Sequence, residues 1–217
     1  VLYCRCTNCG FCFSPKIARW SLAEFAQRIY NKDYVHIDPD YLQTRPLANA
    51  EALIAMFMGR DFSFNHLDYG GGSGLLSQTL SNSGWVSKSY DPFVDRELNV
   101  DQLGIFDLVT AYEVFEHVPD PRALMENLSR LTKTDGIILF STLISDGEIE
   151  PYGTLSWWYA APRNGHISLF SLRSLTLLAA EYGFHFGSFT NGYHVMWRTV
   201  PSWASRIFNN LPAKTGN

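Results

Sequence analysis

The sequence predicts an α/β fold with a mostly parallel sheet that carries helices on both of its faces. From Phe62 onward, short apolar runs typical of strands alternate with longer segments of helical periodicity. Glycines stand where each predicted helix should end and return to a strand, namely Gly84, Gly136 and Gly183. An Asn-Gly pair joins the last two apolar runs, which predicts a C-terminal antiparallel hairpin.

Four segments follow one another along the chain. Residues 1–15 are rich in cysteine and aromatic side chains, and residues 16–60 are predicted to form a helical flap. The alternating strands and helices occupy residues 61–200, and residues 201–217 are predicted to be an exposed tail with one short helix. A chain of 217 residues therefore suits one ordinary domain with a modest appendage.

The flap is predicted to contain two helices. Ser21, with Glu24 three residues later, has the pattern of a capping box, in which the two residues satisfy each other's backbone N–H groups. A second helix should begin near Pro46, because proline suits the first helical turn, and end near Gly59. The first helix carries an apolar series at helical spacing: Leu22, Phe25, Ala26, Ile29 and Tyr30.

The main domain should contain four strands before its terminal hairpin. They are predicted at residues 64–69, 86–90, 108–112 and 137–141, with the hairpin strands at 184–189 and 194–199. The helices between them are predicted at residues 75–83, 121–131 and 171–182.

The composition excludes several classes of protein. Hydrophobic residues make up 46% of the chain, which is enough for a sizeable core, and the formal net charge of −4 lacks the basic footprint of nucleic-acid-binding proteins. Apolar runs such as 137–140 are far shorter than a membrane span, and the first residues do not resemble a signal peptide. All cysteines lie between Cys4 and Cys12, unlike those of a secreted disulfide scaffold. We expect a cytoplasmic protein with a small-molecule partner and no membrane or nucleic-acid partner.

A glycine-rich loop between a predicted strand and a predicted helix is the main functional signal. Its sequence, LDYGGGSG from Leu67 to Gly74, lets the backbone turn sharply and approach a ligand closely. A dinucleotide fingerprint would need glycine where Leu75 or Ser77 stands, and a P-loop would need a Lys-Ser or Lys-Thr pair after the glycines. The loop therefore predicts a nucleotide-type ligand other than NAD; the alternative is a tight turn without a ligand.

An acidic residue followed by GxGxG resembles the first motif of class I S-adenosylmethionine-dependent methyltransferases, and Asp68, Gly70, Gly72 and Gly74 match it. The resemblance covers about residues 62–200 and implies a Rossmann-like sheet of seven strands, whose loop holds the methionine part of S-adenosylmethionine. Other stretches are similar to the same family: FDLV at 106–109, EHVPDP at 116–121, Asp135-Gly136 and the terminal hairpin.

The resemblance also implies residues for the nucleoside part of this cofactor. In that family an acid at the end of the second strand holds both ribose hydroxyls, and Asp91 matches it here. Asp101, with Leu103, is the candidate contact of the adenine, although the stretch from Asp91 to Phe106 is short for a third strand. The alternative is that Asp91 only caps the helix that follows it.

Glu113, Glu116 and His117 would share one face of a helix if a helix begins there. The pattern is similar to that of ubiquinone-pathway O-methyltransferases and small-RNA 2′-O-methyltransferases, in which a further histidine helps to bind a divalent ion; His166 is the matching candidate. In metal-free relatives the same residues brace the helix. We favour the metal-free alternative over a magnesium site, with His117, His166 or Glu113 as the candidate catalytic residues.

A long connection before His166 contains the aromatic residues Trp157, Trp158 and Tyr159. They are predicted either to form a wall of the substrate site or to be the packing that keeps this connection folded. The sequence leaves both alternatives open.

The cysteines suggest a structural metal. Cys6 and Cys9 have the spacing of a zinc knuckle, and Cys4 and Cys12 flank them. The run resembles the second half of the N-terminal zinc-binding module of some sugar methyltransferases, whose first half would lie upstream of Val1. Alternatively, all four thiolates bind one structural zinc ion, or the thiols stay reduced or form a disulfide.

We therefore expect an enzyme that transfers a methyl group from S-adenosylmethionine to an unidentified small molecule. Such a transfer is an in-line displacement, which needs alignment of donor and acceptor, and a base when the acceptor carries a proton. The alternatives are an RNA or quinone-type metal-assisted O-methyltransferase and a non-enzymatic protein-interaction module on the same fold.

Overall fold

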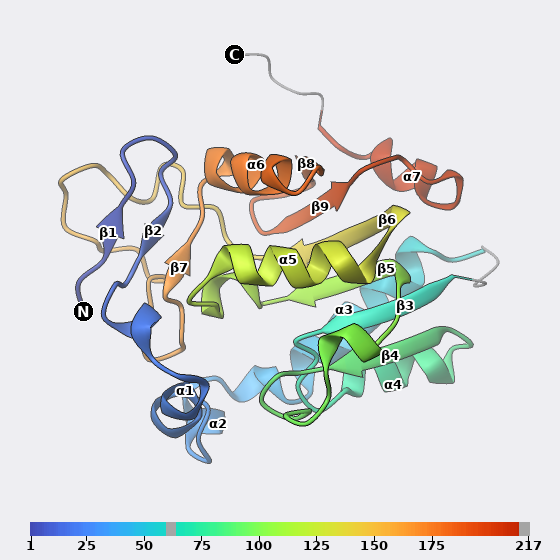
Figure 1. Ribbon diagram of the computed structural model, residues 1–217, viewed down its shortest axis with the longest axis horizontal. Helices are drawn as coiled ribbons and strands as arrows, with labels where there is room; N and C mark the ends of the chain where they lie inside the picture. The colour runs from blue at the N-terminus through green and yellow to red at the C-terminus, as the bar shows by residue number, and fades with distance from the viewer. Residues whose placement is uncertain (60–63, 213–217) are drawn as a thin grey trace.

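The main sheet of the computed structural model, which describes residues 1–59 and 64–212, has six strands in the order β4-β3-β5-β6-β9-β8 (Figure 1). The first four of these are parallel to one another, whereas β9 is antiparallel to both β6 and β8. The strands are β3 (Asn65–Tyr69), β4 (Val86–Tyr90), β5 (Phe106–Tyr112), β6 (Thr132–Ser141), β8 (His185–Ser188) and β9 (Tyr193–Trp197). The predicted parallel sheet and terminal hairpin are therefore confirmed.

The predicted seventh strand is wrong for the described residues. Between β4 and β5 the chain forms turns and one 3-10 turn, Val100–Gln102, and β4 pairs with β3 alone. A parallel crossover with its own helix and strand needs more chain than residues 91–105 provide. The missing strand follows from this short connection.

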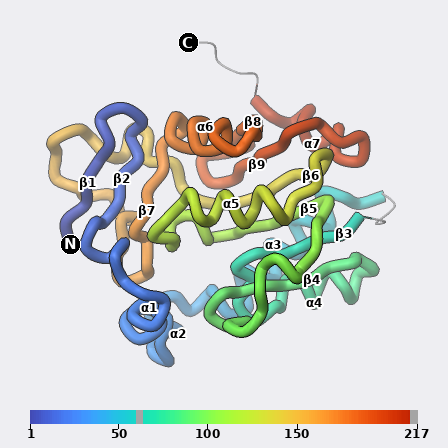
Figure 2. The backbone as a smooth tube through the Cα atoms, viewed as in Figure 1, coloured from blue at the N-terminus to red at the C-terminus, as the bar shows by residue number. Residues whose placement is uncertain are grey.

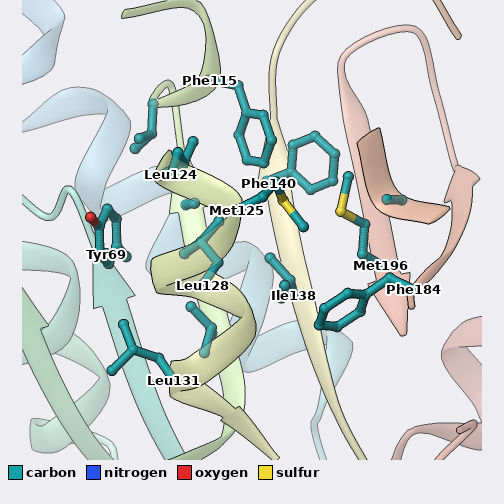
Figure 3. Close-up of a cluster of buried hydrophobic side chains, with 14 of the residues drawn as sticks. Tyr69, Phe115, Leu124, Met125, Leu128, Leu131, Ile138, Phe140, Phe184 and Met196 are labelled. Atoms are coloured by element: carbon teal, nitrogen blue, oxygen red, sulfur yellow. The ribbon is translucent and has the colours of Figure 1, made fainter. Parts of the chain in front are cut away.

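Helices cover both faces of the sheet, because alternate strand residues point to opposite sides. Leu108 and Leu139 pack against α3 (Thr44–Met56), α4 (Leu75–Asn82) and α7 (Ser205–Phe208). Ile138 and Phe140 point the other way, toward α5 (Pro121–Leu131) and α6 (Leu172–Glu181). Figure 3 shows this second layer, in which four side chains of α5 face the sheet: Leu124, Met125, Leu128 and Leu131.

The N-terminal segment forms a small sheet of its own. Strand β1 (Cys4–Arg5) pairs antiparallel with β2 (Cys12–Phe13), and β2 pairs antiparallel with β7 (Ser168–Leu169). Figure 2 shows this blue hairpin beside the orange strand from much later in the chain. The cysteine-rich segment thus forms strand pairing with the connection that follows β6.

The flap is smaller than the sequence predicts. Helices α1 (Leu22–Arg28) and α2 (Tyr34–Ile37) lie at one end of the sheet (Figure 1), and the predicted capping box of Ser21 and Glu24 is confirmed. Helix α3 belongs instead to the layer against the sheet, because Ala50 and Leu53 are fully buried beside α4. The predicted domain boundary at residues 60–61 lies outside the described residues.

The predicted exposed tail packs on the domain. Its short helix exists as α7, preceded by a 3-10 turn at Ser202–Ala204, but Ala204 and Ile207 are buried in the core. Trp203 stacks on Phe64 at 4.9 Å between ring centroids. Apolar side chains here cover the sheet next to α3, which stabilises the segment by hydrophobic burial. Residues 213–217 lie outside the described part of the chain.

Among the described residues, no helix combines the length and the apolar character that crossing a membrane would require.

Candidate functional site

A cavity of about 580 Å³ opens at the carboxyl ends of β3, β4 and β5. In open parallel sheets, ligands bind in this position. Its walls come from the glycine loop after β3, from the end of β5, and from the flap with the start of α3. Flap residues in the wall include Phe25, Tyr30, Tyr34, Asp38, Tyr41 and Arg45, and sheet-side residues include Asp68, Gly70, Gly71, Gly72, Asp91, Glu113 and His117.

The glycine loop has a backbone that only glycine allows. Gly70 has φ +78°, and its N–H donates to the carbonyl oxygen of Tyr90 at 2.7 Å. A Cβ atom on Gly71 would lie 2.6 Å from Oδ2 of Asp68. The predicted sharp turn is therefore present, with Gly70, Gly71 and Gly72 lining the cavity and Gly74 behind them at the start of α4.

A chain of buried polar groups holds Asp68 at the base of the cavity. The Thr110 hydroxyl donates to Oδ1 of Asp68 at 2.8 Å, so its oxygen accepts from Nε2 of His66 at 3.0 Å. Nδ1 of His66 then accepts from the Ser87 hydroxyl at 2.7 Å. Burial raises the pKa of Asp68 to about 7 and lowers the pKa of His66 to about 3. His66, which is not among the predicted site residues, thus supports the glycine loop indirectly through Thr110 and Asp68.

Asp91 lies in the cavity wall at the end of β4, beside the glycine loop. Its Oδ2 accepts from the Gly72 N–H at 3.0 Å, and its Oδ1 accepts from the Phe93 N–H at 2.8 Å. The carboxylate therefore fixes the loop and the following turn, and each oxygen keeps a further lone pair for a ligand. This geometry suits both the predicted ribose contact and the alternative capping role.

Asp101 and Leu103 lie away from the cavity. Asp101 stands in the 3-10 turn at the surface and forms an ion pair with Arg130, while Leu103 is buried in the hydrophobic core. The structure therefore does not bring this predicted pair to the cofactor loop. The reason is the absent third strand, whose end would have directed these residues toward the cavity.

Glu113 projects from the end of β5 on a strained backbone. Its φ of +53° is in the left-handed region, which costs a residue other than glycine about 1 kcal/mol or more. Its N–H donates to the Ser141 hydroxyl and its Oε1 accepts from the same hydroxyl, both at 2.8 Å. Its Oε2 faces Arg45 at 3.7 Å. Such strain is typical of functional sites, and here it aims the carboxylate into the cavity.

The helix on which Glu113, Glu116 and His117 would share one face does not form. Phe115–His117 form only a 3-10 turn, and α5 begins at Pro121. Val118 is extended, with φ −88° and ψ 135°, because a residue before proline avoids the helical region. Asp120, which precedes Pro121, is also extended and caps α5. Glu113 consequently stays outside the group that the other predicted ligands form.

Glu116, His117 and His166 nevertheless converge. One potential ligand atom from each lies within 4.8 Å of the other two, and within the described residues this is the one such group of three or more. Oε2 of Glu116 and Nδ1 of His117 are buried and have no hydrogen-bond partner. Nδ1 of His166 donates to the carbonyl oxygen of Tyr159 at 2.8 Å, which leaves its Nε2 as an acceptor.

The same residues also brace the long connection after β6. The Tyr159 hydroxyl donates to Oε1 of Glu116 at 2.5 Å, and the Ile167 N–H donates to the Glu116 carbonyl at 2.8 Å. Burial, followed by the nearby Glu113, raises the pKa of Glu116 well above its usual range. Burial, followed by His166, lowers the pKa of His117 to about 3. His117 is therefore neutral at neutral pH, and burial disfavours the charged form of Glu116.

The aromatic residues of this connection form packing and not a substrate wall. Trp157 and Tyr159 are buried in a cluster with Cys12 and Leu169, whereas Trp158 is 74% exposed. None of the three lines the cavity. The packing alternative is therefore correct for Trp157 and Tyr159, whereas Trp158 fits neither alternative.

The cavity wall that the sequence analysis missed comes from the flap. Tyr30, Tyr34 and Tyr41 line it together with Arg45 from the first turn of α3. Tyr30 was assigned only to an apolar helix face, since spacing alone does not separate a core residue from one that faces a cavity. The one sequence signal that could have indicated this wall is the density of tyrosines between α1 and α3.

The four cysteines stand apart from the cavity, and they differ in exposure. Cys6 and Cys9 lie at the turn between β1 and β2, where N–H groups of Cys9 and Asn8 hydrogen-bond the Cys6 sulfur and lower its pKa. Cys4 is exposed, whereas Cys12 is buried, which raises the pKa of its thiol to about 11. The four sulfur atoms do not form a converging group like that at Glu116.

Comparison with known proteins agrees with this geometry. A family model described as a methyltransferase domain matches residues 22–186. Ubiquinone biosynthesis O-methyltransferase from Colwellia psychrerythraea is 33% identical over 100 residues, in a match that covers 36% of this chain and 41% of that protein. The same enzyme from Escherichia coli is 28% identical over 137 residues, in a match that covers 52% of this chain and 54% of that protein. The chain thus spans about half the length of the curated relatives it matches.

Solved structures share the fold at low sequence identity. An O-methyltransferase family protein from Burkholderia thailandensis has a TM-score of 0.56 at 12% identity, covering 82% of this chain and 63% of that one. Magnesium protoporphyrin IX methyltransferase from Synechocystis, with bound SAH, has a TM-score of 0.50 at 16% identity, covering 84% of this chain and 98% of that one. Because the family model matches more than half of the chain, and the glycine loop and Asp91 meet at one cavity, the chain belongs to the methyltransferase domain family.

Proposed function

We propose that the protein is a methyltransferase that moves the methyl group of S-adenosylmethionine to a small-molecule acceptor. One observation carries the proposal: the glycine loop, Asp68 and Asp91 line the same cavity as Glu113 and the flap. The loop half of this cavity would bind the cofactor, with its ribose hydroxyls at Asp91. The flap half would then hold the acceptor in line with the methyl group.

Binding measurements test whether the loop half of the cavity binds the cofactor. Calorimetry should show that both S-adenosylmethionine and its demethylated product SAH bind and raise the melting temperature as their excess increases. NAD should not bind, since the loop lacks the dinucleotide pattern. Binding of NAD in place of both methionine derivatives would overturn the proposal. Binding of the cofactor without transfer to any acceptor would favour a protein-interaction module.

Replacing Asp91 with asparagine should weaken SAH binding by about 1–3 kcal/mol, because a charged acceptor of ribose hydroxyls is lost. The amide oxygen can still accept one of the two backbone hydrogen bonds from Gly72 and Phe93, so the fold should persist. Calorimetry gives the affinity and circular dichroism checks the fold. Glu97→Gln nearby is the matched control, since Glu97 is exposed and does not line the cavity. An unchanged affinity in the Asp91 variant would restrict this residue to capping.

For the chemical step we propose Glu113 as the proton acceptor, supported by His117. Both side chains line the cavity, whereas His166 does not. The proposed role of His166 is therefore to position His117, since their rings lie 4.9 Å apart. Glu113, with Oε1 fixed by Ser141, directs its carboxylate toward the place of the acceptor.

A metal-assisted methyltransferase is the second candidate, because two buried ligand atoms lack partners. Oε2 of Glu116, Nδ1 of His117 and Nε2 of His166 would hold the ion, which would polarise an acceptor oxygen. Tyr159 would orient two of these ligands. Two imidazoles and one carboxylate suit zinc or manganese better than magnesium, which prefers oxygen ligands.

Ion titrations separate the two candidates. In the metal-free proposal, millimolar magnesium, manganese or zinc leaves the melting temperature of the SAH-loaded protein unchanged, and a chelator has no effect on transfer. A rise in melting temperature with zinc or manganese, lost in the His166→Asn variant, would establish the second candidate. The matched control is His185→Asn, at an exposed histidine outside the cluster.

We propose that Cys6 and Cys9, at the turn between β1 and β2, bind a structural zinc ion and that Cys12 takes no part in it. The support is the pair of N–H groups at the Cys6 sulfur, which stabilise a thiolate, and the burial of Cys12 among aromatic side chains. Cobalt(II) titration should give a thiolate charge-transfer band that Cys6→Ser removes and Cys12→Ala retains. Loss of the band in the Cys12 variant, while its fold persists, would show that Cys12 is a ligand.

A further inference from the structure

The flap half of the cavity, here called the acceptor chamber, is bounded by Tyr30, Tyr34, Asp38, Tyr41, Arg45 and Glu113. Arg45 is the one lysine or arginine among the described residues that line the cavity. Its guanidinium is already engaged, because it bonds the Asp38 carboxylate and lies 3.7 Å from Oε2 of Glu113. Two carboxylates therefore surround one cation, and the chamber keeps one uncompensated negative charge.

This charge is not needed by the cofactor. S-adenosylmethionine carries a net charge of about +1 from its sulfonium, amino and carboxylate groups, and the loop half supplies Asp91, with Asp68 beneath it. The negative charge at Glu113 thus remains for the second ligand. An anionic acceptor would be repelled by both carboxylates and would find the guanidinium already paired.

The other walls of the chamber are aromatic. The rings of Tyr30 and Tyr34 lie 5.2 Å apart, and those of Tyr34 and Tyr41 lie 5.0 Å apart, in edge-on pairs. The Tyr34 hydroxyl is fixed by the Asn164 carbonyl at 3.1 Å. The hydroxyl of Tyr30 makes no hydrogen bond to a described residue and is available to a ligand. Tyrosine rings attract organic cations, most strongly where water is excluded.

We propose that the acceptor is an organic amine, cationic in solution, on an aromatic or apolar body, and that this enzyme methylates its nitrogen. The proposal rests on the methyltransferase function proposed above. The ammonium ion is attracted by Glu113 and the tyrosine rings, and it transfers one proton to the Glu113 carboxylate. The nitrogen lone pair then forms a bond to the methyl carbon while the carbon–sulfur bond breaks. Its electrons return to sulfur, giving SAH and an N-methylammonium product.

Three probes that share a 4-hydroxyphenyl ring and differ in the charge of the tail test this proposal. They are tyramine, a cation; tyrosol, a neutral alcohol; and 4-hydroxyphenylacetate, an anion. Calorimetry with SAH-loaded protein should show tyramine binding at least tenfold more tightly than the anion, with tyrosol between them. Raising the salt concentration should weaken tyramine binding most, because the attraction is electrostatic.

Variants that each remove one charge identify the residues that cause the preference for the cationic probe. Glu113→Gln should weaken tyramine at least fivefold and leave tyrosol nearly unchanged. Asp38→Asn should free Arg45 and abolish the preference for the cation over the anion. The matched control is Asp40→Asn, which removes the same charge from the same flap outside the cavity and should keep the wild-type order.

Three outcomes would overturn the amine proposal while the cofactor still binds: tightest binding of the anion, equal binding of all three probes, or no binding of any. If tyramine binds tightest and incubation with S-adenosylmethionine methylates its phenol instead of its nitrogen, the chemistry proposed here is also wrong. Failure of SAH itself to bind would overturn the methyltransferase function first, and the amine proposal with it.

Discussion

Gly70→Ala should abolish cofactor binding and lower the free energy of unfolding by about 2–5 kcal/mol. The left-handed φ of +78° costs alanine about 1–2 kcal/mol. Its new Cβ would also lie 2.5 Å from Cγ2 of Val114, an overlap that typically costs a further 1–3 kcal/mol. The loop must move to relieve this overlap, and the movement disturbs the N–H groups that face the cavity. Chemical denaturation and SAH calorimetry measure the two effects.

A matched control separates backbone strain from damage to the loop. Gly84 has φ +90°, yet a Cβ there would meet no atom within 4 Å, and Gly84 does not line the cavity. Gly84→Ala should therefore cost about 1–2 kcal/mol of stability and leave SAH affinity unchanged. Adding Val114→Ala to the Gly70 variant should recover part of the affinity. Full SAH affinity in Gly70→Ala would contradict the assignment of the loop.

Asp68→Asn should stabilise the protein without its cofactor at alkaline pH and weaken the cofactor at the same time. Burial raises the pKa of Asp68 from 3.8 to about 7, so the folded state prefers the protonated carboxyl. The folded state then binds more protons than the unfolded state between these two values, and the stability contributed by this group falls as pH rises through that window. Asparagine carries no charge, so it avoids this loss.

The expected difference therefore depends on pH. Near pH 4 the variant and the parent should have similar stability, whereas above pH 7 the variant should be more stable by on the order of 4 kcal/mol. His66 and His194 shift in the opposite sense, with pKa values lowered to about 3 and 4. They lower the stability of both proteins as pH falls below about 6.5, so only the difference between the proteins isolates Asp68.

Chemical denaturation at a series of pH values measures this difference, and calorimetry measures the accompanying loss of SAH affinity. Asp101→Asn is the control, because Asp101 is exposed and pairs with Arg130 at the surface. It should change stability by less than about 0.5 kcal/mol at every pH and leave the cofactor affinity unchanged. A difference between Asp68→Asn and the parent that is flat with pH would contradict the buried, protonated carboxyl.

The most accurate predictions from sequence were those that rest on neighbouring residues. The strand Val86–Tyr90 and the helix Pro121–Leu131 lie where they were predicted, because alternation, an aspartate cap and Pro121 define their ends locally. The errors share a different cause. The third strand and the exposed tail each depended on how much chain, or which distant apolar surface, was available.

The sequence by itself determined the parallel sheet, the terminal hairpin and the glycine loop with Asp68 and Asp91, because periodicity, turn residues and capping groups act over a few residues. Only the tertiary structure decided what surrounds that loop. Arg45 meets Glu113, Glu116 meets Tyr159, and His66 reaches Asp68 through Thr110, each across a long stretch of chain. Such contacts exist only after burial has brought the elements together, and the same burial raises the pKa of Asp68 and directs the flap tyrosines into the cavity.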